Sequence, residues 1–228
     1  MVIRVILADD EAMIRAGVRS ILTTDPEITV VAEAADGREA IELVRAHRPD
    51  IAMLDIRMPY LDGLSTAAEL RAVAPEVAVI MLTTFDEDDY VSRALTEGAT
   101  GFLLKAADPR ELIIGVRAVA HGAAYLSPRI AQKVIARLSD GRLTRADTAR
   151  HQVETLTPRE RDVLALVGRG MSNQDIAREL FLSEGTVKSH VSAILLRLAL
   201  TNRVQAAIVA YEAGLVGANR PRPPTPSA

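Results

Sequence analysis

Carboxylates, a hydroxyl and an amine follow short apolar runs in the first half of the chain. Asp9 and Asp10 follow Val2–Ala8, Asp55 follows Ile51–Leu54, Thr83 follows Val77–Leu82, and Lys105 follows Gly101–Leu104. Clustered carboxylates repel unless a cation neutralises them, and carboxylate oxygens, waters and a phosphate suit Mg²⁺. A lysine and a hydroxyl can bind phosphoryl oxygens. If these residues converge, they predict a site that holds a metal ion and a phosphoryl group on a carboxylate.

Each of these residues also has a simpler interpretation. Asp55 taken alone is a surface acid that begins a loop, and most such acids only cap or bind water. Thr83 could cap its strand end, although Thr84 is the better candidate for that role. Lys105 as a solvated charge is disfavoured, because its neighbours are apolar and the acids need a counter-charge. No Gly-rich phosphate loop is present, so nucleotide binding is not indicated.

The elements that must position these residues alternate between strand and helix over the first 120 residues. A further apolar run, Thr29–Ala34, makes five strands, nearly continuous in apolar character as in a parallel sheet covered on both faces. Helical patterns lie between and after them at Ala12–Thr23, Arg38–His47, Gly63–Ala74, Asp88–Glu97 and Pro109–Ala120. The order predicts a (βα)5 doubly wound, flavodoxin-like α/β unit whose C-terminal sheet edge carries the polar residues.

Composition narrows the class of protein. The 228 residues are enough for two ordinary domains, and the 49% hydrophobic but 3% aromatic content predicts an aliphatic core. The absence of cysteine excludes disulfides, cysteine-based zinc sites and thiol nucleophiles. No apolar run is long enough for a bilayer and no signal peptide is evident, so we expect a cytoplasmic protein without a membrane partner.

Charge divides the chain into unlike halves. Residues 1–120 hold 12 basic and 21 acidic side chains, whereas residues 155–216 hold 7 and 6. This difference indicates two domains with different partners. The second is too weakly basic to indicate nucleic-acid binding by charge alone.

The middle of the chain is interpreted as a linker. Gly122 is a helix stop, and Ser127-Pro128 is an N-cap followed by proline at the start of a short amphipathic helix with Ile130. Residues 139–154 are polar without hydrophobic periodicity, which predicts a flexible segment. Nucleic-acid contacts by its arginines are the less favoured alternative.

The second half begins its helices with clear signals. Thr157–Glu160 is a capping box with proline in the first turn, and Ser172 and Ser183 cap two further helices. The short turn Phe181–Ser183 between those two helices predicts a helix-turn-helix. A fourth amphipathic helix is expected over Arg203–Ala213, and the Pro-rich tail is expected to be disordered.

The helix after Ser183 has a face that suits DNA. At 100° per residue, a buried stripe forms from Val187, Val191, Ile194, Leu195 and Leu198. Lys188, Ser189 and Ser192 form a polar side, and the flank consists of Thr186, His190 and Arg197. Short polar side chains and lysine can reach base edges while the flank contacts phosphates. A protein-interaction module with a solvated face fits the spacing equally well.

Together these motifs resemble a known family. The Asp9-Asp10 pair, Asp55-x-x-Met58-Pro59-x-x-Asp62-Gly63, Thr83 and Gly101-Phe102-Leu103-Leu104-Lys105 resemble a response-regulator receiver domain. Leu156–Leu164, Asn173–Ala177 and Leu182–Val191 resemble the LuxR-type helix-turn-helix. Nearly the whole chain is therefore similar to NarL/FixJ response regulators.

The resemblance implies roles for the sheet-edge residues. A sensor histidine kinase would phosphorylate Asp55. Asp9, Asp10 and Asp55 would hold Mg²⁺ together with the backbone carbonyl of Arg57. Thr83 and Lys105 would contact the phosphoryl group. Phe102 would be an aromatic rotamer switch, with an ordinary core residue as the alternative.

The resemblance also implies a DNA-binding dimer. Lys188, Ser189 and Ser192 would face bases, and Thr186 and His190 the DNA backbone. Val204, Ile208 and Tyr211 would pair two chains, which would then read repeated half-sites. The family often has Lys-Leu-Gly after the recognition helix, where this chain has Arg197-Leu198-Ala199, a loss of glycine that could lengthen or reorient the turn.

The prediction is a phosphorylation-dependent transcription regulator that is not an enzyme beyond slow autodephosphorylation. We expect an α/β receiver (1–121), a linker with a short helix (122–154), an all-α helix-turn-helix domain of four helices (155–216) and a disordered tail (217–228). One rival is a phosphohydrolase acting through an aspartyl-phosphate. Such enzymes typically place a second acid two residues after the nucleophile, where Arg57 stands. The other rival is a protein-interaction adaptor that binds no DNA.

Overall fold

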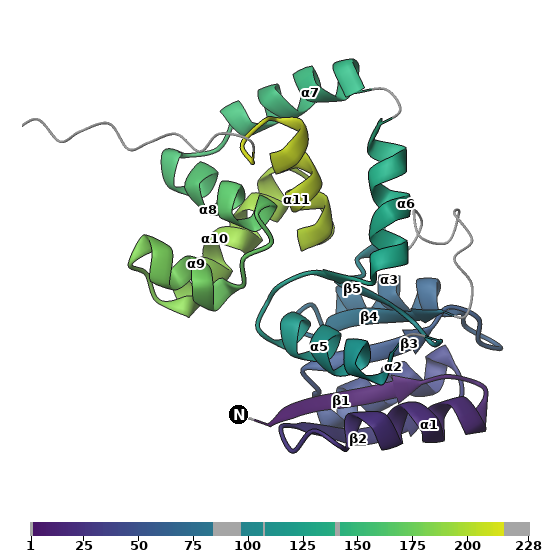
Figure 1. Cartoon of the computed structure of the whole chain (residues 1–228). Helices are drawn as coiled ribbons and strands as arrows, with labels where there is room; N and C mark the ends of the chain where they lie inside the picture. Colours follow the sequence, from purple (N-terminus) through teal and green to yellow (C-terminus); the bar gives the residue numbers. More distant parts are fainter. Residues whose placement is uncertain (1, 84–96, 107, 140–141, 217–228) are drawn as a thin grey trace, which may run out of the picture.

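The computed structural model describes residues 2–83, 97–106, 108–139 and 142–216. Its first half is a six-stranded parallel sheet with strand order β2-β1-β3-β4-β5-β6 (Figure 1). The strands are β1 (Ile3–Ala8), β2 (Ile28–Ala34), β3 (Ile51–Asp55), β4 (Ala78–Thr83), β5 (Gly101–Leu104) and β6 (Tyr125–Leu126). The predicted doubly wound unit is confirmed, and the two-residue β6 is an addition that the sequence did not indicate.

Helices cover both faces of the sheet. They are α1 (Ala12–Leu22), α2 (Gly37–His47), α3 (Gly63–Val73) and α5 (Pro109–Ala120). Side chains alternate along each strand, so Val5 and Leu7 join the core cluster beneath α1 and α5 while Ile6 and Ala8 join the cluster beneath α2 and α3. The predicted helix Asp88–Glu97 lies, apart from its last residue, outside the described residues.

The linker contains more regular structure than predicted. Helix α6 (Pro128–Ser139) is confirmed, but residues 142–154 form a second helix, α7 (Arg142–Glu154). The prediction of a flexible segment there was wrong. Ala149 and Val153 on α7 are buried in the core of the second half and anchor the helix there. The Ser127 hydroxyl makes no hydrogen bond within the described part of the chain, so it does not act as the predicted side-chain cap.

The second half is the expected helical domain. Its helices are α8 (Pro158–Gly168), α9 (Asn173–Leu180), α10 (Glu184–Arg197) and α11 (Arg203–Glu212). The capping box of Thr157 and Glu160 is present, and Ser172 and Ser183 accept hydrogen bonds from the first turns of α9 and α10. These three helix starts confirm the predictions.

The end of α10 differs from expectation. Ala199 adopts a left-handed φ of +53°, and the backbone N–H of Leu200 donates to the carbonyl of Leu195 at 2.8 Å. Ala199 therefore takes the left-handed conformation that glycine commonly adopts after a helix end. The cost is an alanine in a conformation that L-residues disfavour.

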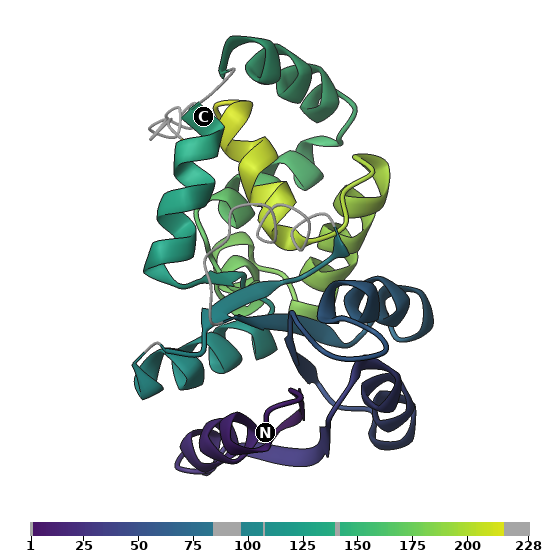
Figure 2. The same cartoon turned by 90° about the vertical axis from the view of Figure 1, so that its right-hand side faces the viewer.

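The two halves meet along α11. Val204 is 4% exposed and belongs to the same core cluster as Ile130 and Val134 of α6. Figures 1 and 2 both show α11 beside α6. A second contact joins the end of α5 to the start of α9, where the N–H of Asn173 donates to the carbonyl of His121 at 3.2 Å. No helix within the described ranges has both the length and the apolar character needed to cross a membrane.

Candidate functional site

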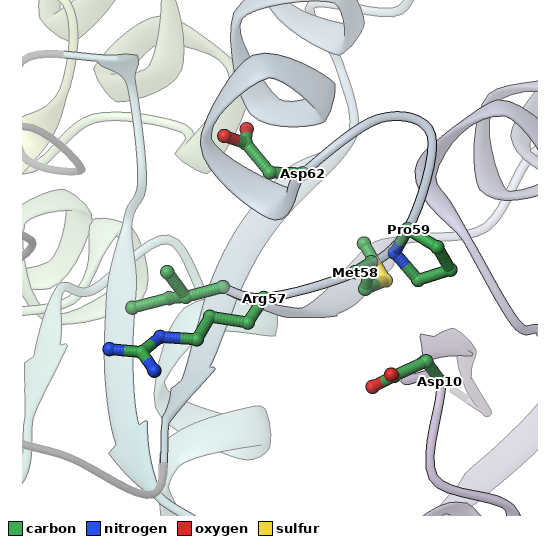
Figure 3. A pocket seen from close by; sticks show the side chains of 6 residues that line it. Asp10, Arg57, Met58, Pro59 and Asp62 are labelled. Carbon is green, nitrogen blue, oxygen red and sulfur yellow. The ribbon is translucent and has the colours of Figure 1, made fainter.

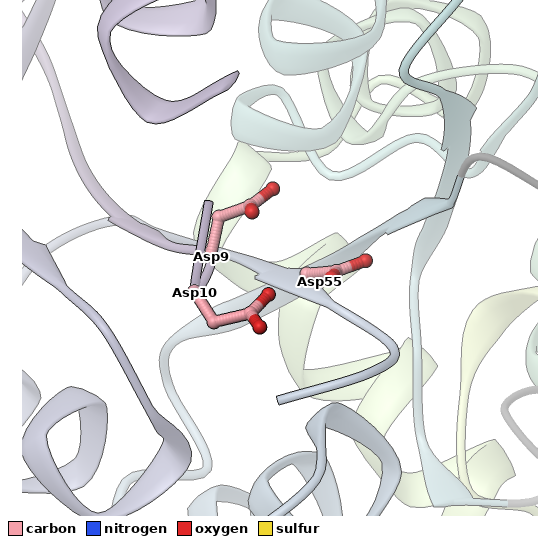
Figure 4. A group of neighbouring side chains, drawn as sticks. All are labelled: Asp9, Asp10 and Asp55. Atoms are coloured by element: carbon pink, nitrogen blue, oxygen red, sulfur yellow. The ribbon is translucent and has the colours of Figure 1, made fainter. Parts of the chain in front are cut away.

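Three aspartates converge at the C-terminal edge of the sheet. Asp9 and Asp10 follow β1, and Asp55 is the last residue of β3. Each offers a carboxylate oxygen, and these oxygens lie within 4.8 Å of one another (Figure 4). Asp9 and Asp55 are buried and Asp10 is exposed. Because carboxylate oxygens held this close suit a hard divalent cation, the cluster fits a metal ion that also remains open to solvent at Asp10.

Lys105 supplies the counter-charge that the sequence predicted. Its Nζ lies 2.6 Å from Asp9 Oδ2 and 3.0 Å from Asp55 Oδ2, and its side chain is 4% exposed. Burial disfavours the ammonium, but the hydrogen bonds to the two aspartates outweigh this and raise the pKa of Lys105. Burial raises the pKa of Asp55, although Lys105 opposes the shift. Lys105, Asp9 and Asp55 therefore form a buried charge network of one ammonium and two carboxylates.

Thr83 and Phe102 occupy neighbouring strands. Thr83 ends β4 and is 5% exposed, and its carbonyl accepts from the Lys105 N–H at 2.8 Å. Phe102 on β5 is fully buried, in the core cluster that also contains Val204 of α11. The structure therefore brings Thr83 and Lys105 to the same edge as Asp55. It places Phe102 inside the core, one layer below that edge.

The loop after Asp55 folds back against the strand that carries it. The N–H of Gly63 donates to the carbonyl of Ile56 at 3.0 Å, and a Cβ on Gly63 would lie 2.0 Å from the carbonyl oxygen of Asp55. Only glycine fits this approach, which gives the Asp62-Gly63 pair a physical reason. Asp62 in turn caps α3, accepting from the Ser65 N–H at 2.7 Å.

A pocket of about 340 Å³ opens beside the aspartates. Its lining residues are Asp10, Ile56, Arg57, Met58, Pro59 and Asp62. Figure 3 shows Asp10 across from the Arg57–Pro59 segment. The exposed carboxylate of the cluster therefore faces a space that a small ligand can enter.

The polar side of α10 is open to solvent. Thr186, Lys188, Ser189 and Ser192 are exposed, and His190 is half-buried. Two of these groups have partners one turn away on the same helix: Lys188 Nζ lies 3.7 Å from Glu184, and the Ser189 hydroxyl donates to the carbonyl of Gly185 at 3.1 Å. An exposed pair of this kind contributes little, so a nucleic acid can replace it at low cost.

Comparison with known proteins identifies both halves. Residues 5–117 match the response regulator receiver domain, and residues 154–210 match the LuxR family of bacterial regulatory proteins. The uncharacterized transcriptional regulatory protein YxjL of Bacillus subtilis is 38% identical over 214 residues, 94% of this chain and 97% of YxjL. The chain belongs to the response regulators with a LuxR-type DNA-binding domain.

Other relatives agree with this assignment. The nitrate/nitrite response regulator NarL of Escherichia coli K12 is 38% identical over 208 residues, which cover 91% of this response regulator and 94% of NarL. The solved structure of the response regulator ChrA is 36% identical with a TM-score of 0.52, over 94% of this chain and 98% of ChrA. The likeness therefore extends over both domains.

Arg197 of this response regulator has an internal role. Its Nη1 lies 3.0 Å from the buried carboxylate of Glu160 and also donates to the Thr155 carbonyl. The Thr157 backbone N–H lowers the pKa of Glu160, and Arg197 adds to that effect. Arg197 therefore fixes α10 onto the start of α8 and is not a free phosphate contact on the flank.

The predicted dimerisation face is largely covered. Val204 is buried and Ile208 packs against the same core cluster, whereas Tyr211 is 47% exposed. Next to them the buried Arg203 donates to Asn173 Oδ1 at 2.7 Å, and burial lowers the pKa of Arg203 to about 10. The sequence does not predict this contact, because 30 residues separate Arg203 from Asn173 and no local pattern pairs them.

Proposed function

We propose that a sensor histidine kinase transfers a phosphoryl group to Asp55 of this response regulator. The observation that carries the proposal is the convergence of Asp9, Asp10 and Asp55 within 4.8 Å around Lys105. Asp9, Asp10, Asp55 and the backbone carbonyl of Arg57 would hold Mg²⁺, which would neutralise the phosphoryl charge in the transfer. Such partners and the DNA target argue for a cytoplasmic protein.

The transfer assigns a task to each side chain. An oxygen of the Asp55 carboxylate attacks phosphorus, the bond from phosphorus to the kinase histidine nitrogen breaks, and the bonding pair leaves with that nitrogen. Lys105 moves from its carboxylate partners to a phosphoryl oxygen, and the Thr83 hydroxyl donates to another. Arg57 stands where a phosphohydrolase typically places its second acid, so we expect the aspartyl-phosphate to be hydrolysed only slowly.

We infer that the modification acts on α11. Phe102 pairs with Leu126 of β6, and its carbonyl accepts from the Ser127 N–H at 2.9 Å. Phe102 also shares a core cluster with Val134 of α6 and Val204 of α11. If Thr83 shifts toward the phosphoryl group, Phe102 can move into the space it leaves and disturb that shared cluster. A near-complete switch requires a differential of about 5.5 kcal/mol between the two states.

Release of α11 would permit dimerisation. In the arrangement described above, Val204 faces the receiver and α6, whereas Lys188 on α10 is already open. Phosphorylation would therefore control pairing of two chains, and a homodimer would bind repeated sites in double-stranded DNA through Thr186, Lys188, Ser189, His190 and Ser192. Val204, Ile208 and Tyr211 would form the contact between the two chains.

A genome-wide DNA-binding map tests this function. Cells carrying the native protein, Asp55→Ala or Lys188→Ala are compared under the same inducing condition. We expect occupied promoter sites with the native protein only. Promoter occupancy unchanged in Asp55→Ala would contradict phosphorylation control. Occupancy unchanged in Lys188→Ala would favour the protein-interaction adaptor over the DNA-binding protein. Turnover of small phosphoesters by the pure protein would instead favour the phosphohydrolase.

A further inference from the structure

The turn between β1 and α1 carries two of the three aspartates. Asp9 Oδ1 accepts from the Glu11 N–H at 3.0 Å, and Asp9 Oδ2 contacts Lys105. Among the described residues, no side chain caps the start of α1, because Glu11 occupies the N-cap position without a capping hydrogen bond. Helix α1 therefore begins without a side-chain N-cap, directly after the two aspartates.

Arg15, one turn into α1, fixes this turn instead. Its Nη1 donates to the backbone carbonyl of Asp9 at 2.5 Å, and its side chain is only 19% exposed. Its Nε lies 3.6 Å from one carboxylate oxygen of Glu33 on β2, which is an ion-pair distance and too long for a hydrogen bond. The other oxygen of Glu33 lies 3.1 Å from Arg19, which is 53% exposed. Arg15 thus joins the β1–α1 turn to strand β2, whereas Arg19 is a second, more exposed partner of the same Glu33 carboxylate.

The positive charge of Arg15 should by itself disfavour Mg²⁺ binding at the nearby aspartates. A positive charge near an acidic cluster weakens the binding of another cation there. Arg15 is aimed at the main chain of Asp9 and at Glu33, not at the three clustered carboxylates. Any favourable effect of Arg15 on Mg²⁺ binding must therefore come from the position in which it holds the turn.

We propose that Arg15 is a positioning residue for the metal site and that Glu33 is its anchor. By holding the carbonyl of Asp9, Arg15 sets the direction in which Asp9 and Asp10 present their carboxylates. The proposal rests on the proposed function, because it concerns how the same site holds Mg²⁺. Residues that orient metal ligands typically change metal affinity by about 10-fold to 100-fold when removed.

The sign of the effect separates a geometric role from a purely electrostatic one. If Arg15 is only a nearby positive charge, Arg15→Met strengthens Mg²⁺ binding. If Arg15 positions the turn, Arg15→Met weakens binding despite the lost repulsion. Arg15→Lys keeps the charge, but the shorter lysine ammonium cannot reproduce both the hydrogen bond to the Asp9 carbonyl and the ion pair with Glu33, so it also weakens binding.

Titration calorimetry of Mg²⁺ into the unphosphorylated full-length protein makes the measurement. We expect Arg15→Met to raise the Kd by about tenfold. Arg15→Lys and Glu33→Gln should raise it by smaller factors. The matched control, Arg19→Met, removes the other partner of Glu33 and should leave the Kd unchanged or slightly lower. Equal Kd values for Arg15→Met and Arg19→Met, or tighter binding by Arg15→Met, would overturn the proposal.

A second readout excludes a general loss of folding. In phosphorylation by acetyl phosphate, the Arg15 variants should need more Mg²⁺ for half-maximal rate, while the donor concentration for half-maximal rate at saturating Mg²⁺ stays unchanged. If Arg15→Met does not fold, Glu33→Gln, which keeps the side-chain size, decides the question by the same two readouts. If the native protein binds no Mg²⁺ and accepts no phosphoryl group, the proposed function itself fails. If the native protein does both and the Arg15 and Glu33 variants match it, only the positioning role fails.

Discussion

The two surfaces that carry function in this response regulator are built in opposite ways. In the receiver cluster the side chains of Asp9, Asp55 and Lys105 are buried, and Lys105 Nζ lies 2.6 and 3.0 Å from the carboxylates of Asp9 and Asp55. The polar side of α10 is exposed, and its Lys188 forms a 3.7 Å surface contact with Glu184. The charged groups of the first site already contact one another, whereas those of the second face solvent. The difference agrees with the proposal that the first site accepts a small charged group and that the second binds a large polyanion.

This contrast predicts how each surface responds to change. A residue of the buried cluster should affect chemistry and stability together, because its charges are desolvated and coupled. A residue of α10 should affect binding and leave stability alone, because its contacts are exposed.

The largest effect is expected from Asp55→Asn. An amide cannot accept the phosphoryl group, so covalent labelling by a phosphodonor should fall to background. The assay is incorporation of labelled phosphate with Mg²⁺ present. Asp62→Asn is the control, since Asp62 caps α3 through a bond that an amide oxygen can also accept. Full labelling of the Asp55→Asn protein would move the phosphoacceptor elsewhere.

The next effect concerns DNA. Lys188→Ala should weaken promoter binding by about 1–3 kcal/mol and leave the melting temperature unchanged. Binding is measured by fluorescence anisotropy on a fragment taken from the genome-wide map. Arg150→Ala is the control, because Arg150 is an exposed cation on α7 that pairs only with Asp147 in the described contacts. Equal losses from the two variants would assign DNA contact to the linker region as well.

A substitution at the contact between the halves should release α11. A Cβ on Gly122 would lie 2.1 Å from Asn173 Nδ2, so Gly122→Ala should favour the separated arrangement by about 1–3 kcal/mol. Gly170→Ala is the matched control, with a similar φ of +78° but no atom within 4 Å of the added Cβ. Sedimentation should show dimer without phosphorylation for Gly122→Ala alone. Dimer in both variants would attribute the effect to backbone strain.

The pH dependence of stability gives a smaller effect with a defined sign. Burial raises the pKa of Asp55 above the unfolded value of about 3.9, so the folded state binds this proton more tightly. The contribution of Asp55 to stability is therefore least favourable above its raised folded pKa and improves as pH falls through that value. The melting temperature of the native protein minus that of Asp55→Asn should rise as the pH is lowered from 7 to 4. A difference that falls over this range would mean that Lys105 outweighs burial.

The smallest effect is expected at the end of α10. Ala199→Gly should stabilise the protein by about 0.5–1 kcal/mol, because glycine adopts the φ of +53° without steric conflict. The melting temperature should rise by about 1–4 °C. Ala193→Gly, in the interior of the same helix, should lower it. A lower melting temperature for Ala199→Gly would show that the left-handed turn costs alanine nothing here.

Local patterns explain what the sequence could predict. Apolar runs such as Ile51–Leu54 and caps such as Thr157 act within a few residues, so the strands, most helices and the sheet-edge position of Asp55 follow from them. The convergence of Asp9, Asp55 and Lys105 also follows, because parallel strands end at one edge. Roles at the atomic level, such as metal coordination through Arg57, stay predictions.

Long-range contacts account for what was missed. Strand β6 exists because two residues pair with β5, and α7 is anchored by Ala149 and Val153 against the second core. Arg15 reaches Glu33 and Asp9 through folding rather than through any periodic pattern. The covering of Val204 by the receiver and α6 depends on how two domains meet, which no segment of the sequence encodes locally.

We propose that phosphorylation of Asp55 releases α11 and thereby permits pairing of two chains. Sedimentation velocity of the full-length protein with Mg²⁺, with and without a small phosphodonor, tests it most directly. We expect a monomer without the donor, a dimer with it, and a monomer in both conditions for Asp55→Asn and for Val204→Asp. The same oligomeric state with and without phosphorylation, in a protein shown to carry the phosphoryl group on Asp55, would contradict it.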